Sequence, residues 1–385
     1  MIIFAARFHN KKSKRMESKE IQPGMFGLKH TNRDFSKEDT WGKNIFNSFF
    51  PASLVAYMSS KSVNPVYITL NKNLKVVHKY ISGTQLFGID PLSDELYYSF
   101  ESSYAPFDGF FVGTRERENI DLVLLSLKDG HKTPLHGLEI KLTALPDSST
   151  RNNSEDNMSC EIVVRPPTIC YIACGILEHY KTSSKLQTLR QLIEGVPNID
   201  HWEDASSVGP HYQKIREAII RVMKDMVRYQ TPIMVQPVWK TEPKKASLTD
   251  DCLDVFVWSN IALMKTCADI ELKLRKRKNG DTYYKIERTH RTIIWLYRML
   301  FEYVTFNSVF DYQRITSLTY GTDTDKAFSR QGTSTIDFLR SPELTHPRIN
   351  KSEIKNIILG GGQNFLSPER RFDAILVNTP GLFED

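Results

Sequence analysis

The sequence contains few cysteines, and none of them form a recognised motif. The five cysteines among 385 residues are odd in number and include no Cys-x-x-Cys pair, which argues against a disulfide framework and against a zinc finger. Cys170 and Cys174 are one helical turn apart in an apolar segment. We therefore expect both of them to pack inside a core.

Long hydrophobic runs are also missing. The longest, such as residues 167–177, are about half as long as a bilayer span. The opening residues 1–6 are too short for a secretory signal and lack a preceding positive segment, while a basic stretch follows at 11–15. We therefore expect a cytoplasmic protein without a membrane segment, and we interpret residues 1–24 as a disordered lead-in.

Signatures of several enzyme classes are absent as well. There is no Gly-x-Ser-x-Gly elbow for acyl transfer, and the glycines at 360–362 lack the Lys-Ser/Thr pair of a phosphate-binding loop. His131 and His136 lack the accompanying Asn and second His of a His-metal nuclease, so we expect both in a loop. These absences exclude serine hydrolases, nucleotide-binding loops and His-metal nucleases.

The composition is that of an ordinary globular protein with a modest basic charge. Hydrophobic residues make up 40% and charged residues 25% of a chain long enough to bury a substantial core. The formal net charge of +6 and the pI of about 8.8 have the sign expected of a polyanion binder.

Polar residues interrupt two apolar strand patterns in an unusual way. Asp121 lies in the pattern at 119–125, and Glu139 and Lys141 lie in the pattern at 138–142. Because strand side chains alternate between faces, Glu139 and Lys141 share one face, and pairing of the strands brings Asp121 to the same place. Two carboxylates beside an ammonium predict a divalent-cation site suited to phosphodiester hydrolysis. The same pattern also occurs in hairpins where these residues form only a solvated face.

The rest of the chain predicts a mixed sheet flanked by helices, an α/β (α+β) fold. No internal repeat or long low-complexity tract is present. A segment at 95–103 is predicted as a helix flanking the first strand. Further strands are expected at 109–113, 119–125, 138–145, 161–165, 232–238 and 253–258, and helices at 168–180, 211–229 and 292–304.

A basic cluster predicts a DNA-contacting hairpin. An Asn279-Gly280 turn and a Tyr-Tyr pair at 283–284 are flanked by basic residues. Such clusters contribute sequence-independent affinity for phosphates through counterion release. The cluster consists of Lys273, Arg275, Lys276, Arg277, Lys278, Lys285, Arg288 and Arg291. A solvated basic loop is the alternative.

Base reading is less well located. The polar segment at 329–335 contains Arg330 and Gln331, with Arg340 and Arg348 beyond it, and these side chains can address guanine edges. Loops rich in Gly, Ser and Thr also serve simply as connections. We name Arg330 and Gln331 as candidate DNA contacts.

The surroundings of the acidic pair carry a family resemblance. The run Gly-Leu-Glu-Ile-Lys-Leu-Thr-Ala-Leu-Pro-Asp at 137–147, with Pro166-Pro167 after it, resembles the HindVP-like type II restriction endonucleases of the PD-(D/E)xK superfamily. The resemblance covers about residues 25–375. Its outer motifs are Phe-Gly-Leu-Lys at 26–29, Asn-Arg-Asp-Phe at 32–35, Trp-Gly-Lys-Asn at 41–44, Phe-Phe-Pro-Ala-Ser-Leu at 49–54, Gln-Pro-Val-Trp-Lys-Thr at 236–241 and Asp-Val-Phe-Val-Trp-Ser at 254–259.

The resemblance implies a mechanism. Asp121 and Glu139 would hold Mg²⁺ with the carbonyl of Ile140 as a further ligand, and Lys141 would orient the attacking water. The substrate would be double-stranded DNA with a short palindrome, of the GRCGYC type, read by a homodimer. A cognate DNA methyltransferase would act in the same restriction-modification system without stable contact.

The resemblance also implies a restriction-endonuclease-like core with C-terminal DNA-recognition elaborations. We expect the nuclease core at 25–260 and a helical and basic C-terminal region at 261–385, packed on that core. The superfamily's Pro-Asp pair is absent because Ile120 precedes Asp121, so Asp108 is a rival for the first carboxylate. A DNA-repair or structure-selective nuclease and a non-catalytic DNA-binding protein are the alternative functions.

Overall fold

The structure is a computed structural model that describes residues 28, 30–32, 43–112, 118–144, 162–241, 248–322, 328–330 and 347–351. The lead-in at 1–24, Gln331, Arg340 and the glycines at 360–362 lie outside these residues. No helix in the described part of the chain is long and apolar enough to cross a membrane.

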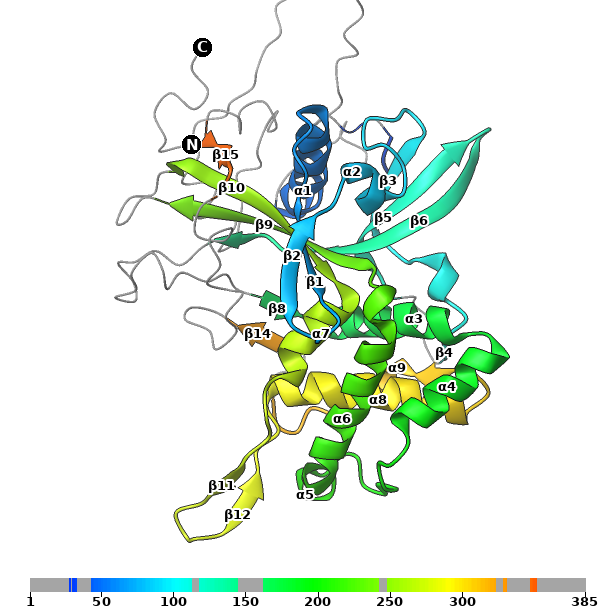
Figure 1. The fold of residues 1–385 in the computed structure, drawn as a ribbon, viewed down its shortest axis with the longest axis vertical. Coiled ribbons are helices and arrows are strands. Elements are labelled where there is room, and N and C mark those ends of the chain that lie inside the picture. The colour runs from blue at the N-terminus through cyan, green and yellow to red at the C-terminus, as the bar shows by residue number, and fades with distance from the viewer. Residues whose placement is uncertain are drawn as a thin grey trace, which may run out of the picture.

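A mixed sheet forms the centre of the molecule (Figure 1). Within the described residues it has nine strands, in the order β2-β1-β10-β9-β6-β5-β3, with β7 paired to β9 and β15 paired to β10. The β1–β10 and β6–β9 pairs are parallel, and the β5–β6 and β9–β10 pairs are antiparallel. The strands are β1 (Val66–Leu70), β2 (Val76–Tyr80), β3 (Leu96–Ser102), β5 (Ile120–Lys128), β6 (His131–Ile140), β7 (Thr143–Ala144), β9 (Pro232–Thr241), β10 (Leu248–Ser259) and β15 (Ile349–Asn350).

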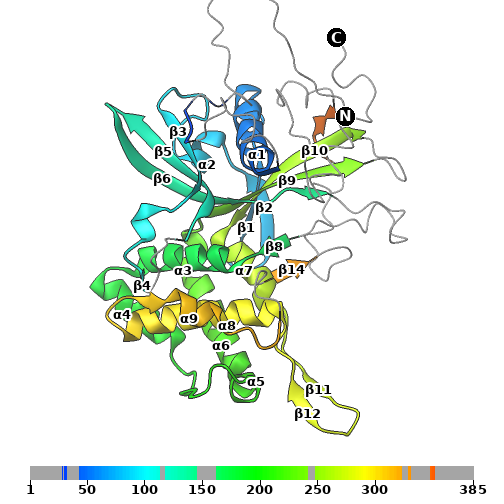
Figure 2. The ribbon, with the colours of Figure 1, turned by 180° about the vertical axis from the view of Figure 1, so that it is seen from behind.

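Helices pack on both faces of this sheet and enclose two hydrophobic cores (Figures 1 and 2). One core lies under α1 (Lys43–Ser60) and α2 (Gly83–Phe87). The larger core lies under the other helices: α3 (Pro166–Tyr180), α4 (Ser183–Ile193), α5 (Ala205–Val208), α6 (Tyr212–Asp225), α7 (Asn260–Ala268), α8 (Arg288–Thr305) and α9 (Tyr312–Thr316). The predicted mixed sheet flanked by helices is therefore confirmed.

Alternation along the central strands divides their side chains between the two cores. Leu138 and Ile140 of β6 face the core under α1, as do Leu122 and Leu124 of β5. Leu122 lies directly opposite Leu138 in the antiparallel register. Continuing that register by one residue places Asp121 beside Glu139, on the face that carries α3.

Several peripheral strands hold segments that are far apart in the sequence. β4 (Phe111–Val112) pairs in parallel with β13 (Phe310–Asp311), and β8 (Ile162–Val164) pairs with β14 (Phe328–Arg330). A separate hairpin consists of β11 (Leu274–Lys276) and β12 (Thr282–Tyr284). The structure therefore contains the hairpin expected from the Asn-Gly turn.

Two predicted features are wrong. The segment at 95–103 is strand β3, paired with β5, because its buried residues Leu96, Tyr98 and Phe100 repeat with a period of two. His131 and His136 lie in β6, because β5 and β6 continue to a tight turn at Asp129-Gly130 in which both residues have positive φ.

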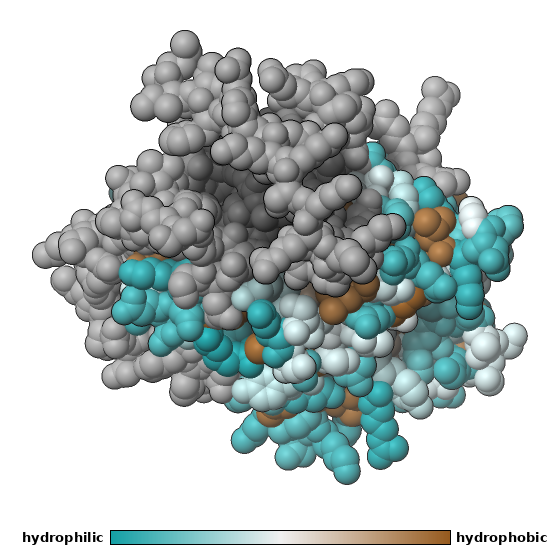
Figure 3. Space-filling model, turned by 90° about the horizontal axis from the view of Figure 1, so that it is seen from above, coloured by the Kyte–Doolittle hydropathy of each residue, from teal (hydrophilic) through white to brown (hydrophobic). Residues whose placement is uncertain are grey.

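The surface that is described is mainly polar. On the face drawn in Figure 3, hydrophilic residues predominate among the described residues, and apolar ones occur singly or in small groups. The exposed large hydrophobic residues are dispersed along the chain: Tyr80, Leu92, Val112, Tyr229, Leu274 and Phe306. Scattered apolar residues of this kind are ordinary on protein surfaces.

Candidate active site

Asp121, Glu139 and Lys141 meet at the junction of β5, β6 and β9. The Lys141 ammonium lies 3.3 Å from Asp121 Oδ2 and forms an ion pair with Glu139 Oε1. Asp121 Oδ2 also accepts a 2.8 Å hydrogen bond from the backbone N–H of Ile140. The N–H of Lys141 donates to the carbonyl of Val235 on β9 at 3.0 Å. Three strands thus hold the predicted residues in contact.

The three side chains differ in exposure. The Glu139 side chain is 6% exposed and that of Lys141 is 17% exposed, whereas that of Asp121 is 36% exposed. Asp121 is therefore the most solvent-exposed of the three side chains.

Burial and charge shift the pKa values of the two inner groups. Burial raises the pKa of Glu139, and the nearby Asp121 carboxylate adds to the rise, while Lys141 opposes it. For Lys141, burial acts against the charged form, but the carboxylates of Glu139 and Asp121 prevail and raise its pKa. Lys141 thus stays an ammonium, and Glu139 holds a proton to higher pH than an ordinary glutamate.

The donor set fits Mg²⁺. Mg²⁺ binds hard oxygen ligands and commonly uses one or two carboxylates while it keeps several waters. Asp121 and Glu139 supply carboxylate oxygens, and the carbonyl of Ile140 directly follows Glu139 in the chain. No group of three or more His, Cys, Asp or Glu residues suited to a metal is present in the described residues, so water would complete the coordination.

The first turn of α3 contributes a residue that the sequence did not reveal. Arg165 is the N-cap residue of α3, and Pro166 and Pro167 occupy its first two positions. Thr168 follows, is completely buried, and has its hydroxyl directed at the Glu139 carboxylate, whose pKa it lowers. The buried Thr168 hydroxyl forms no hydrogen bond of normal geometry in the structure, and the Glu139 carboxylate is the charged group that it influences. It is therefore placed to orient Glu139.

A cleft of about 470 Å³ adjoins α3 at the same end. Its lining includes Arg165, Glu118, Tyr312 and Gln313. Burial raises the pKa of Glu118, and a hydrogen bond with Tyr312 opposes that rise. The Arg165 charge acts on Lys141, and the Glu139 charge acts on Tyr312. The cleft therefore borders the acidic site and gives it a cationic wall at Arg165.

The rival carboxylate, Asp108, lies elsewhere. It follows the 3-10 helix at Ala105–Phe107, on the segment that leads to β4. The carboxylate that hydrogen-bonds to Ile140 and Lys141 belongs to Asp121. The geometry therefore favours Asp121 as the partner of Glu139.

The candidate DNA contacts separate into distinct groups. Six of them are exposed on or beside the β11–β12 hairpin: Lys273, Arg275, Lys276, Arg277, Lys278 and Lys285. Arg288 is partly buried at the start of α8. Arg330 ends β14, opposite Ile162. Gln331 falls outside the described residues.

Arg291, predicted as a phosphate contact, has a structural position instead. It is completely buried, its guanidinium lies 4.7 Å from the centre of the Trp295 ring, and it donates to the carbonyls of Thr319 and Thr322. A side chain enclosed in this way has no access to a phosphate. We remove Arg291 from the set of DNA contacts.

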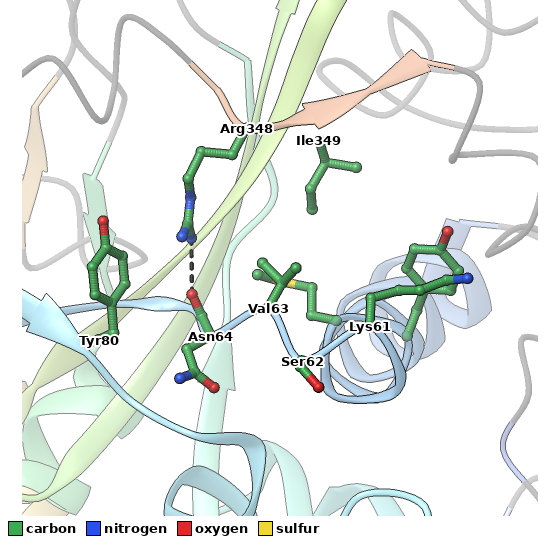
Figure 4. Close-up of a pocket in the computed structure, with 9 residues that line it drawn as sticks. Lys61, Ser62, Val63, Asn64, Tyr80, Arg348 and Ile349 are labelled. Carbon is green, nitrogen blue, oxygen red and sulfur yellow. Dashed lines mark hydrogen bonds between the residues drawn. The ribbon is translucent and has the colours of Figure 1, made fainter.

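Arg348 is also bound within the protein (Figure 4). Its guanidinium donates to both carboxylate oxygens of buried Asp254, at 2.8 and 2.9 Å, and to the carbonyl of Asn64 at 2.9 Å. It also lies 5.0 Å from the centre of the Tyr80 ring, beside a cleft of about 420 Å³. Arg348 fastens the segment before β15 to the sheet, so its predicted role in reading guanine is not supported.

Known proteins resemble the chain over nearly its whole length. The HindVP restriction endonuclease family matches residues 41–383. The type II restriction enzyme HgiDI of Herpetosiphon aurantiacus is 40% identical over 365 residues, which are 94% of this chain and 98% of the relative. The probable type II restriction enzyme HindVP of Haemophilus influenzae is 38% identical over 365 residues, 94% of this chain and 96% of the relative. No solved structure matches the chain significantly.

Proposed function

This chain belongs to the HindVP restriction endonuclease family, and we propose that it is a type II restriction endonuclease that hydrolyses double-stranded DNA with Mg²⁺ at a short palindromic site. The observation that carries this proposal is the contact among Asp121, Glu139 and Lys141. Two carboxylates and an ammonium at one point supply the groups that metal-assisted phosphodiester hydrolysis needs.

In this mechanism each residue has a separate task. Asp121 and Glu139 would hold the cation, and the Ile140 carbonyl would supply a further oxygen. Mg²⁺ bound there would stabilise the charge that develops on the pentacovalent phosphate. Lys141, kept charged by the two carboxylates, orients the attacking water and favours its deprotonated form. Because it remains protonated, Lys141 acts through its charge and its hydrogen bonds and does not accept the proton from water.

The biological setting follows from the family. We propose that a homodimer reads the palindrome with its two-fold axis on that of the DNA site, and that the site is of the GRCGYC type. A cognate methyltransferase would protect host DNA in the same cytoplasm without stable contact with the endonuclease. The relatives are named as type II restriction enzymes, which supports this assignment.

Digestion of DNA of known sequence with Mg²⁺, followed by mapping of the ends, tests the proposal. We expect discrete fragments whose ends share one palindrome, and no cleavage by Lys141→Met. Structure-dependent cutting without a shared sequence would indicate a repair nuclease. Binding without any cleavage would indicate a non-catalytic DNA-binding protein. An active Lys141→Met protein would contradict the role given to Lys141.

A further inference from the structure

The β11–β12 hairpin extends away from the helical layer as a narrow arm (Figures 1 and 2). Its turn is closed by two backbone hydrogen bonds, from Arg277 N–H to the Asp281 carbonyl and from Gly280 N–H to the Arg277 carbonyl. Gly280 has φ of +94°, a conformation that glycine adopts readily. The arm is therefore a regular two-stranded ribbon.

His290 on α8 joins the two ends of the ribbon at its base. Its Nδ1 accepts the backbone N–H of Glu287 at 3.0 Å, so the ring proton is on Nε2 and donates to the Glu271 carbonyl at 3.2 Å. Glu271 precedes β11 and Glu287 follows β12. The neutral ring thus connects the strand that leaves the body with the strand that returns to it.

At its base, one face of the ribbon contacts the protein through Tyr284. Tyr284 packs against Gly209, where a Cβ atom would lie only 2.2 Å from Tyr284 Cγ. Gly209 has φ of −52°, which any residue can adopt, so close approach of the Tyr284 ring is what requires glycine here. Lys276 shares the face of Tyr284, because Leu274 pairs with Tyr284 and Lys276 pairs with Thr282.

The other face carries exposed cations around an aromatic ring. Arg275 lies directly opposite Tyr283, and the Arg277 guanidinium lies 5.2 Å from the centre of the same ring. Arg275 and Lys285 both approach Glu287, at 3.7 and 3.8 Å. These shared contacts place Arg275, Arg277, Tyr283 and Lys285 on one side of the ribbon, which we call the cationic face.

We infer that the cationic face binds the sugar-phosphate backbone of the DNA duplex, and that the ribbon is held in its binding orientation by Tyr284 on Gly209. This inference rests on the proposed function. The cations are exposed, and their charge complements that of phosphate. Surface ion pairs such as those with Glu287 stabilise them only weakly, so these pairs would not prevent contact with DNA. Arg277 is exposed beside the Tyr283 ring, and its planar guanidinium has the fork geometry for bidentate contact with phosphate oxygens.

Salt-dependent binding to a short duplex of random sequence tests the face, with Glu139→Ala protein used so that the DNA stays intact. We expect Arg275→Gln and Arg277→Gln each to reduce the slope of log K against log salt by about one unit. Lys276→Gln, on the opposite face of the ribbon, is the matched control and should leave the slope unchanged. Equal effects of Arg275→Gln and Lys276→Gln, or none from either, would overturn the inference.

A second variant tests the docking without a change of charge. Gly209→Ala should displace the Tyr284 ring, and we expect it to lower affinity and slope as Arg275→Gln does, with unchanged circular dichroism. Tyr284→Ala should give the same result if Gly209→Ala fails to fold. Normal binding by both variants would show that the docking is irrelevant to DNA.

Cleavage of plasmid DNA by the unmodified chain distinguishes failure of this inference from failure of the proposed function. If the chain cuts plasmid DNA but the ribbon variants bind normally, only the inference fails. If the unmodified chain neither cuts nor binds DNA, both fail. A change in the sequence that Arg275→Gln cuts would overturn the backbone assignment in favour of base reading.

Discussion

Asp121 is fastened to the neighbouring strand through Ile140, whose backbone N–H donates to Asp121 Oδ2 at 2.8 Å. This bond fixes the carboxylate beside Glu139 before any cation arrives. Asp121 thus has two properties that a substitution can test separately: its oxygen accepts this hydrogen bond, and its carboxylate carries a negative charge.

Asp121→Asn should therefore keep much of the local geometry and still lose cleavage. The amide oxygen can accept from Ile140, but it carries no charge for the cation. We expect single-turnover cleavage to fall by more than roughly 100-fold, since even indirect supports of a metal site cost 10–100-fold when removed. DNA binding should persist, because loss of a negative charge reduces repulsion of phosphates. Near-normal cleavage by Asp121→Asn, with loss in Asp108→Asn, would transfer the role to Asp108.

The raised pKa of Glu139 predicts how cleavage depends on pH. Burial, helped by Asp121, raises this pKa, so the carboxyl is protonated at pH values where an ordinary glutamate is charged. The protonated form cannot hold a cation. As the pH falls through the raised pKa, cleavage should therefore be lost, and higher Mg²⁺ should move that loss to lower pH.

Substitution of Thr168 should shift the dependence of cleavage on pH. Its hydroxyl lowers the pKa of Glu139, because a hydroxyl beside a carboxylate favours the charged form. Thr168→Val should move the loss of cleavage to higher pH, whereas Thr168→Ser should retain the original pH dependence. Cleavage rates measured against pH for the three proteins check this. A uniform loss of rate with an unchanged pH dependence would show that Thr168 only packs.

The sequence was informative where a pattern is local. Alternating apolar residues on both sides of Asp121 and Glu139 predicted two paired strands, and the structure contains them as β5 and β6. The Asn279-Gly280 turn likewise predicted the β11–β12 hairpin. In each case the pairing partners are close in the chain, so one register explains the contacts.

Contacts between distant segments were not predictable in the same way. Thr168 reaches Glu139 because the fold brings the first turn of α3 to the end of β6, which no local pattern of the chain specifies. A basic residue gives no indication in the sequence of whether an acid or a ring will enclose it. For this reason the sequence suggested Arg291 and Arg348 as DNA contacts, although both side chains bind to other groups within the folded protein.

Arg348 should therefore be a stability residue. Its guanidinium pairs with both oxygens of Asp254, which is completely buried. Arg348→Ala leaves that carboxylate without its cation, and breaking a buried pair in this way costs about 3–5 kcal/mol. Urea denaturation should show this loss, and Asp254→Asn in the Arg348→Ala background should recover part of it. Unchanged stability with altered sequence specificity would restore Arg348 as a reader of bases.

The ribbon should become loosely anchored at acidic pH. Burial lowers the pKa of His290, against the opposing effects of the Glu271 carbonyl and the Glu287 carboxylate, and Tyr212 covers the ring edge-on at 5.1 Å. A folded-state pKa below the unfolded value of about 6.5 means that the unfolded chain binds the proton more readily. The contribution of His290 to stability is therefore complete above about pH 6.5, and it declines as the pH falls from there through the lowered pKa.

Protonation of His290 should loosen the ribbon in particular, because of the position of its Nδ1 atom. A proton added to Nδ1 would face the Glu287 N–H and break the bond that holds the returning strand. Hydrogen exchange at the Arg277 amide should therefore accelerate at acidic pH relative to amides within β9, after correction for the intrinsic exchange rate. His290→Asn, whose side-chain oxygen can accept from Glu287 but does not titrate, should abolish that pH dependence. If Arg277 and the β9 amides change in parallel, or if His290→Asn keeps the response, His290 does not anchor the ribbon.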